Sequence, residues 1–374
     1  MTRILYIGMD VHTTNYTLCA YSMEEDRCFA ETQVDPDVKN IMEYLFRIEK
    51  QYRKEKKCNC KFVCGYEAGC LGYSLYYELS AKDIECKIIA PSTIPTAPNE
   101  KKTDRRDARK LSKCLAFNTC SYVHIPEEED IAVKEYIRMR DDIKQSLKST
   151  KQQILSFCTR HGKKYPGKSY WTIGHVKWIK EQSFGNAIMD ETFQEYLLQY
   201  NELSAKVERL DKRIEELAKD ERYAENVKKL SCFLGVKTHT ALAVLSEVGD
   251  FRRFDKAEKF ASFLGLVPAV HDSSDNHPRL GITKAGNSHL RRLLIEAAHS
   301  YSRGAVGHKS KALKVRQDGN DPKTISYADR ANTRLRRKYY QLIIGGGKLS
   351  NVAKTAVARE LACFMWGMIT GNTD

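Results

Sequence analysis

The chain has 374 residues, of which 42% are hydrophobic and 29% charged, a composition typical of a soluble globular protein with two or three domains. Lysine and arginine outnumber aspartate and glutamate, and the formal net charge is +14, which favours a polyanionic partner, nucleic acid ahead of an anionic membrane surface. Apolar runs such as Leu361 to Ile369 are far shorter than the roughly 20 residues that span a bilayer, and the N-terminus lacks a signal-peptide layout. We therefore expect a cytoplasmic protein without a membrane partner.

Twelve cysteines raise the question of a disulfide framework or a zinc site. Cys58, Cys60, Cys64 and Cys70 cluster, but they form no paired CxxC and have no histidine at ligand spacing. Cys64 also lies in a predicted buried strand, where a free thiol behaves as a small hydrophobic group. The spacing therefore favours reduced, structural cysteines over zinc ligands.

The first third of the chain mixes predicted strands and helices. The apolar patterns predict strands at 4–10, 16–21, 61–66 and 85–90, and helices at 37–54, 71–79 and from 104 onward. The first two strands form a plausible hairpin, and the prolines at 91, 95 and 98 mark a loop before the last helix. This order predicts an α/β layer with acidic residues at strand ends.

The middle of the chain is predicted to be helical. From 127 to about 160 the helical pattern is continuous, and a second stretch then repeats apolar residues at alternating spacings of three and four, the a/d pattern of a coiled coil. These positions are Phe193, Tyr196, Tyr200, Leu203, Val207, Leu210, Ile214 and Leu217. Two interpretations remain open: self-association through this stripe, or one long helix packed on its own chain.

The last third is predicted to be mostly helical as well. Helices are expected at 241–248, at 257–264 and from Ser288 onward, and a polar loop at 267–280 carries Ser273 and Ser274. The segment 309–338 has many more basic than acidic residues, which indicates a phosphate-facing surface with some solvated positions.

A short basic stretch, Lys102 to Arg109, contains two aspartates three residues apart. On a helix this spacing places Asp104 and Asp107 on one face, where a divalent cation can relieve their mutual repulsion. Arginines between them are suited to phosphate. A solvated mixed-charge helix would have the same pattern, so the motif gains weight only from acids elsewhere.

Asp10 and Glu67 are the further acids that suit the same site, because each follows a predicted strand. Four carboxylates favour Mg²⁺ or Mn²⁺, and such ions can stabilise the attacking and leaving oxygens of a phosphoryl transfer. Each acid alone could be a turn residue. The segment Ile7 to Thr14 also looks like the first phosphate loop of sugar kinases and Hsp70-type ATPases, but a second DxGxG or DxGxT loop is missing, which disfavours an ATPase.

The motifs together resemble those of the insertion-sequence-110 family of transposases, which are bridge-RNA-guided DNA recombinases. Gly8-Met9-Asp10-Val11 is similar to the family's first acidic motif, Tyr66-Glu67-Ala68-Gly69 to the second, and Ala90 through Ala108 to the third and fourth, which complete a DEDD signature. In the second half, the resemblance is carried by the segments 264–268, 282–287, 351–353 and 358–361.

The resemblance implies an architecture of α/β plus α: a RuvC-like, RNase H-type domain over 1–162, a helical coiled-coil connection over 163–222, and a mostly helical transposase domain over 223–374. It also implies a serine nucleophile. Alignment from Pro268 to Ile282 places that serine at Ser273, but the triplet Asp272-Ser273-Ser274 lacks the glycine that usually follows, so Ser274 stays an alternative.

The resemblance further implies double-stranded donor and target DNA, a guide RNA, a homo-oligomer such as a dimer or tetramer, and a nucleoid-associated location. The expected metal ligands are Asp10, Glu67, Asp104 and Asp107. Softer candidates for phosphate contacts are Arg105, Arg106, Arg109, His271, Arg279, Lys284, Arg291 and Arg292. Two other functions fit the same residues: a Mg²⁺-dependent junction nuclease that uses the acids alone, and a non-catalytic nucleic-acid-binding protein.

Overall fold

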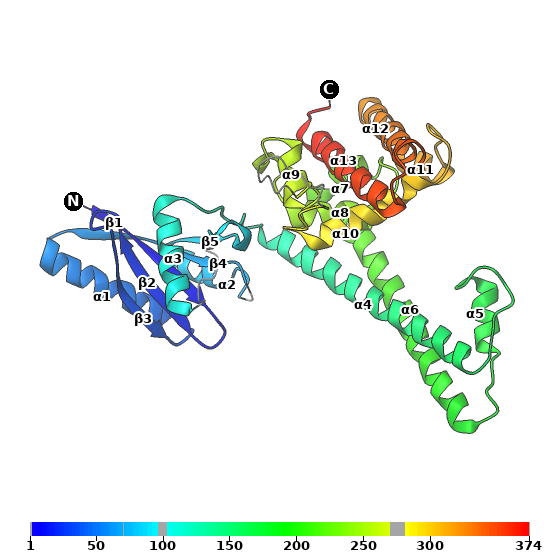
Figure 1. The fold of residues 1–374 in the computed structure, drawn as a ribbon, viewed down its shortest axis with the longest axis horizontal. Helices are drawn as coiled ribbons and strands as arrows, with labels where there is room; N and C mark the ends of the chain where they lie inside the picture. Colours follow the sequence, from blue (N-terminus) through cyan, green and yellow to red (C-terminus); the bar gives the residue numbers. More distant parts are fainter. Residues whose placement is uncertain (1, 70, 96–102, 270–280, 374) are drawn as a thin grey trace. The chain divides into compact units, whose positions relative to one another are not determined.

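The computed structural model describes residues 2–69, 71–95, 103–269 and 281–373 (Figure 1). Contacts divide the chain into two compact units, residues 1–125 and 126–374. The first unit is a mixed five-stranded sheet with helices, and the second is mostly helical. This confirms the α/β plus α architecture at the level of the two units, while the three-part division at 162 and 222 stays a prediction.

The sheet of the first unit has the strand order β3-β2-β1-β4-β5. Its first three strands pair antiparallel, and β1, β4 and β5 pair parallel. The bounds are β1 Thr2–Val11, β2 Tyr16–Ser22, β3 Arg27–Val34, β4 Asn59–Glu67 and β5 Glu85–Ile89. The predicted opening hairpin is therefore confirmed as β1 and β2. The edge strand β3 was not predicted, because it is largely polar and only partly buried and so lacks an alternating apolar pattern.

Helices cover both faces of this sheet. On one face lie α1 (Val38–Lys56) and α2 (Ser74–Ser80), and on the other lies α3 (Asp104–Phe117). The apolar stripe of α1, with Ile41, Leu45 and Ile48, packs on the strand residues Leu5, Ile7 and Met9. A capping bond from the amide of Lys39 to the side chain of Asp37 begins α1. The short helix η1 (Pro91–Thr93) follows β5.

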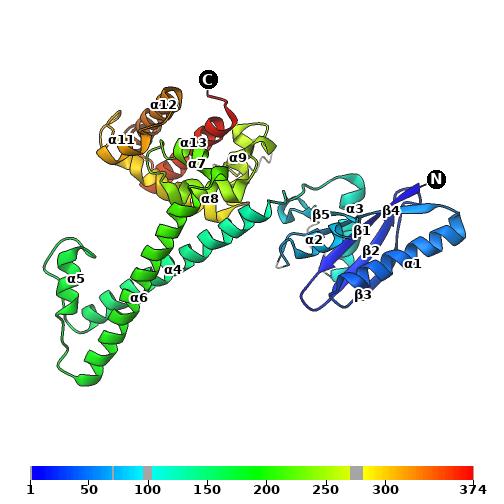
Figure 2. The same ribbon diagram turned by 180° about the vertical axis from the view of Figure 1, so that it is seen from behind.

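The second unit begins with a long helical hairpin. Helices α4 (Glu128–Arg160) and α6 (Ala187–Leu217) lie side by side, and α5 (Ile173–Lys180) lies near the end of the pair (Figures 1 and 2). Phe193, Leu210 and Ile214 of the predicted heptad stripe are buried within this chain. The structure therefore favours the second interpretation of the stripe, a helix packed on its own chain.

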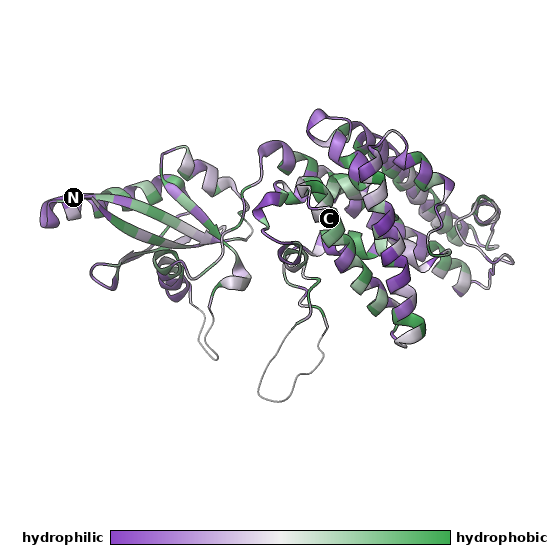
Figure 3. Ribbon diagram, turned by 90° about the horizontal axis from the view of Figure 1, so that it is seen from above, coloured by the Kyte–Doolittle hydropathy of each residue, from purple (hydrophilic) through white to green (hydrophobic). Residues whose placement is uncertain are grey.

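The rest of the second unit forms one helical body around a large apolar core. Its elements are α7 Glu221–Leu230, α8 Thr238–Val248, η2 Phe251–Arg253, α9 Ala257–Phe263, α10 Ser288–Ala298, η3 His299–Ser302, α11 Lys311–Gln317, α12 Pro322–Tyr340, η4 Gln341–Gly345 and α13 Ser350–Thr370. Figure 3 shows hydrophobic residues along the strands of the first unit and on the helices of the second. The predicted helices at 241–248, at 257–264 and from Ser288 are confirmed as α8, α9 and α10.

The basic segment 309–338 is partly used to hold this body together. The Arg336 side chain is buried and donates to the carbonyl oxygens of Ala305 and His308. Arg316 donates to the carbonyl of Ser231, and Lys309 forms an ion pair with Asp329. These cations bind groups of their own chain, so fewer of the basic residues in this segment are left for the predicted phosphate-facing surface.

The described cysteines are free thiols, and most are buried. Burial raises the pKa of the Cys64 thiol well above its ordinary value, so this side chain acts as part of the apolar core of the first unit. None of the described helices combines the length and the apolar character needed to cross a membrane.

Candidate functional site

The site begins at the carboxyl ends of two parallel strands. β1 and β4 pair in register from Thr2 and Asn59 to Met9 and Tyr66. Asp10 and Glu67 are the next residues on the two strands, so they occupy neighbouring positions at one edge of the sheet. Because side chains alternate along a strand, Asp10 lies on the sheet face opposite that of Met9, and Glu67 opposite that of Tyr66.

The same face of the sheet carries two glycines on which α3 packs. Gly8 and Gly65 are partners across β1 and β4. A Cβ atom on Gly8 would overlap the carbonyl oxygen of Ala108 and the amide nitrogen of Ser112, and a Cβ atom on Gly65 would meet the Leu115 side chain. Because neither strand has a side chain here, the backbone of α3 approaches the sheet closely.

The beginning of α3 brings the second pair of acids to the site. Thr103 caps the helix by accepting from the amide of Arg106, and Asp104 and Asp107 lie in the first turn. Asp104 is four residues before Ala108, the residue that covers Gly8, so it extends the sheet-facing stripe toward Asp10. Acids in a first turn also interact favourably with the helix dipole.

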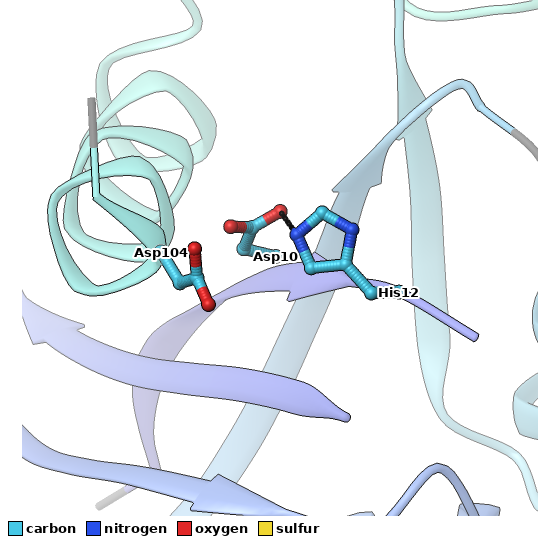
Figure 4. A group of neighbouring side chains, drawn as sticks. All are labelled: Asp10, His12 and Asp104. Atoms are coloured by element: carbon cyan, nitrogen blue, oxygen red, sulfur yellow. Dashed lines mark ion pairs between the residues drawn. The ribbon is translucent and has the colours of Figure 1, made fainter. Parts of the chain in front are cut away.

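The resulting cluster joins β1, the turn after it and α3. The potential ligand atoms of Asp10, His12 and Asp104 all lie within 4.8 Å of one another (Figure 4). The imidazole Nε2 of His12 is 3.5 Å from Oδ1 of Asp10, and the carboxylate of Asp104 points toward both residues. Glu67 is exposed, Asp107 is half-buried, and both are outside this close group as the described residues are placed.

His12 is not among the ligand candidates predicted from the sequence. It follows directly after β1, two residues beyond Asp10, and extended backbone over that spacing places both side chains on the same face. The donor set of two carboxylates and one imidazole suits a divalent cation, since carboxylates bind Mg²⁺ and Mn²⁺ and imidazole favours transition metals. A DEDD domain implies such a metal, and the side chains present fit one.

The basic side chains of α3 differ in their surroundings. Arg105 and Arg106 are exposed at its first turn. Arg109 forms a two-pronged ion pair with Glu31 of β3, in which Nη2 lies 2.8 Å from Oε2. The unpredicted strand β3 therefore supplies a partner for Arg109, which fastens α3 to the edge of the sheet.

The serine candidates Ser273 and Ser274 lie outside the described residues, as do His271 and Arg279. The segments on either side of them are joined. Pro268 and Ile282 form an antiparallel bridge, the amide of Ala269 donates to the carbonyl of Gly281, and the amide of Thr283 donates to that of Val267. The two ends of the serine segment are therefore held side by side.

The segments 264–268 and 282–287, which carry the family resemblance on either side of the serines, contact each other. Gly265 has a φ of +64°, and a Cβ atom there would overlap the carbonyl oxygen of Ala285. Arg291 of α10 donates to the carbonyls of Leu264 and Ala285, so its guanidinium stabilises this contact. Lys284 is exposed. Arg292 is bonded to Asp141 of α4 and Glu296 of α10, at 2.6 and 3.1 Å.

Comparisons with known proteins agree with this arrangement. Residues 7–161 match the model of the DEDD transposase domain of IS110-type elements, and residues 227–312 match that of the transposase IS116/IS110/IS902 family. The first match contains all four predicted acids, and the second contains the predicted serines.

Similar full-length proteins point to the same family. The transposase for insertion sequence element IS1533 of Leptospira borgpetersenii is 30% identical over 91% of this chain and 97% of its own length. The y4qE protein of Sinorhizobium fredii is 35% identical over 81% of this chain and 74% of its own. The transposase for element IS1111A of Coxiella burnetii is 24% identical over 81% and 79%. From its acidic motifs to its C-terminal half, the chain belongs to the IS110/IS116/IS902 family of transposases.

Proposed function

We propose that this transposase, a DNA phosphoryl-transfer enzyme, cleaves and rejoins DNA strands through a covalent link between a serine and DNA. In this proposal Asp10, Glu67, Asp104 and Asp107 hold Mg²⁺ or Mn²⁺. The observation that carries it is the packing of α3 on Gly8 and Gly65, because this packing places the first turn of α3 above the ends of β1 and β4.

The metal, when bound, supplies charge stabilisation to the oxygens of the reacting phosphodiester. The chain's own contribution is to hold Asp10 and Asp104 close together before DNA arrives, with His12 beside them as a further candidate ligand. The capped first turn of α3 and the Arg109–Glu31 pair fix Asp104 and Asp107 relative to the sheet. Arg105 and Arg106 are exposed beside these acids, and we assign them to contacts with DNA phosphates.

Ser273 is the proposed nucleophile, with Ser274 as the alternative. Its Oγ gives its proton to a base and bonds to the phosphorus, while the bond from phosphorus to the bridging sugar oxygen breaks and that oxygen takes up a proton. Attack by a strand hydroxyl on the phosphoserine reverses these changes and restores the serine. One phosphodiester replaces another, so the exchange requires no ATP. The described residues on either side of the serine segment, Pro268 and Ile282, form an antiparallel bridge.

The finer organisation follows the family. We assign a RuvC-like domain to 1–162, a coiled-coil connection to 163–222 and the serine-bearing domain to 223–374. The proposed partners are double-stranded donor and target DNA and an element-encoded guide RNA, bound by a dimer or tetramer. Phe193, Leu210 and Ile214 of the α6 stripe are buried within their own chain, and the other stripe residues are half-buried.

The serine step is tested by trapping the protein on DNA. We expect a protein–DNA adduct that survives denaturation and contains no phosphotyrosine. It should form with the natural protein and with Ser274→Ala, but not with Ser273→Ala. An adduct lost only with Ser274→Ala would transfer the role to that residue. Metal-dependent cleavage that survives both changes would replace the recombinase with a junction nuclease.

Two further measurements test the remaining parts. Calorimetry should detect Mg²⁺ or Mn²⁺ binding that Asp10→Asn abolishes, and a folded protein that binds no metal would favour a non-catalytic binder. Sequencing of copurified nucleic acid should return a transcript of the element itself. Recombination by protein freed of that RNA would reject the guide.

A further inference from the structure

A groove in the second unit lies between α4, α6, the start of α8 and α10. It has a volume of about 1230 Å³. Lys144, Lys148 and Lys151 of α4 line one side, and Lys237 and Arg292 lie on other lining elements. None of these residues belongs to the acidic cluster or to the serine segment. We propose that this groove binds the phosphodiester backbone of DNA.

The three α4 lysines are arranged for a linear polyanion. Spacings of four and three residues put them on one face of the helix, over about 10 Å of its axis. An equal length of duplex carries about six phosphates. Lys144 and Lys148 are exposed, as is Lys237 across the groove. In the part of the chain that the structure describes, these three make no ion pair.

The groove's acidic side chains are largely neutralised from within. Asp141 contacts Arg140 at 2.9 Å and Arg292 at 2.6 Å, and His239 and His289 at 2.9 and 2.8 Å. Asp211 contacts Arg140 at 2.6 Å. Glu296 contacts Arg292 at 3.1 Å, and Asp142 and Glu215 also line the groove. The lining carries four lysines and three arginines against five acids, so its net charge is positive and the excess comes from the lysines.

Lys151 is the half-buried lysine of the groove. Its ammonium lies over the rings of Trp171 and Tyr200, 4.9 and 5.7 Å from their centroids. Burial, together with the nearby Lys144, lowers the pKa of Lys151. A cation so placed is stabilised by an anion, and a DNA phosphate in the groove provides one.

This site rests on the proposed function only in that the protein acts on DNA. It makes no use of the metal or the serine, so a binding assay without divalent cations separates the two proposals. If the groove does not bind DNA, the proposal for cleavage by serine is not affected. If no serine adduct forms, the proposal for DNA binding in the groove is not affected.

The test compares two double variants of the full chain. Lys144→Gln with Lys148→Gln removes two groove cations. Lys206→Gln with Lys219→Gln removes two exposed lysines elsewhere on the second unit and produces the same change in net charge. Binding to a duplex is measured by fluorescence anisotropy in EDTA at several salt concentrations. The groove variant should reduce the slope of log affinity against log salt by about two, and the control by much less.

Lysine acetylation of the natural protein provides a direct readout that is independent of variant folding. Bound duplex should protect Lys144, Lys148 and Lys237 and leave Lys206 and Lys219 reactive. Equal salt slopes for the two variants, or unprotected groove lysines on saturated protein, would overturn the proposal. Protection by RNA but not by duplex DNA of the same sequence would overturn the assignment to DNA.

Discussion

Gly8 of β1 is the in-register partner of Gly65 of β4, and α3 packs on both residues. The two contacts differ in kind. Gly8 faces the backbone of α3 at Ala108 and Ser112, whereas Gly65 faces mainly the flexible side chain of Leu115. The position of Asp104, one turn before Ala108, therefore depends more directly on Gly8 than on Gly65.

Replacing Gly8 with alanine should displace α3 and separate Asp104 from Asp10. Overpacking of a tight core contact costs about 1–3 kcal/mol, and rigid backbone on the other side places this change at the upper end. Hydrogen exchange should become faster in α3, and calorimetry should show weakened Mn²⁺ binding.

Gly65→Ala serves as the matched control because the Leu115 side chain can rotate away. Its effect on both measurements should be clearly smaller. If Gly8→Ala binds Mn²⁺ with the natural affinity and retains slow exchange in α3, the close packing on Gly8 does not position the acid.

Sequence patterns were sufficient for the local parts of the acidic site. Asp10 and Glu67 were predicted at strand ends and Asp104 and Asp107 on one helix face, because each depends on the spacing of nearby residues. Glu31 and His12 could not be placed in the same way. Glu31 lies on an edge strand that lacks an apolar pattern, and it meets Arg109 only through the tertiary fold.

The cations show the same limit more clearly. Arg291 and Arg292 are adjacent on a basic helix, yet Arg291 supports backbone carbonyls and Arg292 contacts an acid of α4. Charge in a sequence does not reveal whether a guanidinium turns inward. For Lys144 and Lys148 the sequence predicts only that they belong to a long helix. The groove that they line depends on the packing of α8 and α10 against that helix.

His12 should give the acidic site a preference for Mn²⁺ over Mg²⁺. An imidazole nitrogen is a better ligand for a transition metal than for Mg²⁺, which prefers oxygen. In the natural protein loaded with Mn²⁺, electron spin-echo spectroscopy should detect a coupled nitrogen, and His12→Gln should abolish that signal. The same change should weaken Mn²⁺ binding more than Mg²⁺ binding.

The control for His12→Gln is Asp104→Asn. This change should weaken the binding of both Mn²⁺ and Mg²⁺, but any Mn²⁺ that still binds should keep its nitrogen coupling. A nitrogen signal that persists in His12→Gln would assign it to another residue and remove His12 from the ligand set.

His289 of α10 makes the second unit sensitive to pH. Its Nε2 contacts Asp141 at 2.8 Å and its Nδ1 contacts Glu247 at 2.5 Å. Burial opposes protonation of His289, but the hydrogen bonds to the two carboxylates prevail and raise its pKa. Burial alone would raise the pKa of Glu247, yet bonds from His289, Arg138 and Asn287 lower it to about 2.

A raised histidine pKa means that the folded state binds the proton more tightly than the unfolded state. This stabilisation is complete below the ordinary pKa of about 6.5 and is lost as pH rises through the folded value. The contribution of Glu247 has the opposite sign: it is present above about 4.3 and lost as pH falls through about 2. All three tryptophans lie in the second unit, so urea unfolding followed by tryptophan fluorescence reports on it.

His289→Gln should lower the free energy of unfolding at pH 6 by about 1–3 kcal/mol and flatten its decline above pH 6.5. His308→Gln is the control, because His308 lies outside this network and is exposed at the surface of the same unit. If the free energy of unfolding of His289→Gln depends on pH as that of the natural protein does, the proton responsible for this dependence binds to another residue.

Asn332 of α12 should be among the polar residues on which the helical body most depends. Its side-chain oxygen accepts from the amide of Leu234 and the hydroxyl of Tyr301, at 2.8 and 2.9 Å, and its amide nitrogen donates to the carbonyl of Cys232 at 3.2 Å. Three buried groups therefore share one side chain.

Asn332→Leu leaves the amide of Leu234 and the hydroxyl of Tyr301 without this partner, whereas the carbonyl of Cys232 still accepts from Gln317 at 3.2 Å. Each unsatisfied buried group costs about 1–3 kcal/mol, so we expect a loss of at least about 2 kcal/mol in the urea unfolding of the second unit. Asn332→Asp keeps the acceptor, and at a pH where its carboxyl is neutral the O–H can also donate to the carbonyl of Cys232, so its loss should be smaller there. Asn351→Ala, at an exposed position, controls for loss of an asparagine and should have little effect. Equal stability of Asn332→Leu and the natural protein would show that water or rearranged neighbours satisfy the Leu234 amide and the Tyr301 hydroxyl.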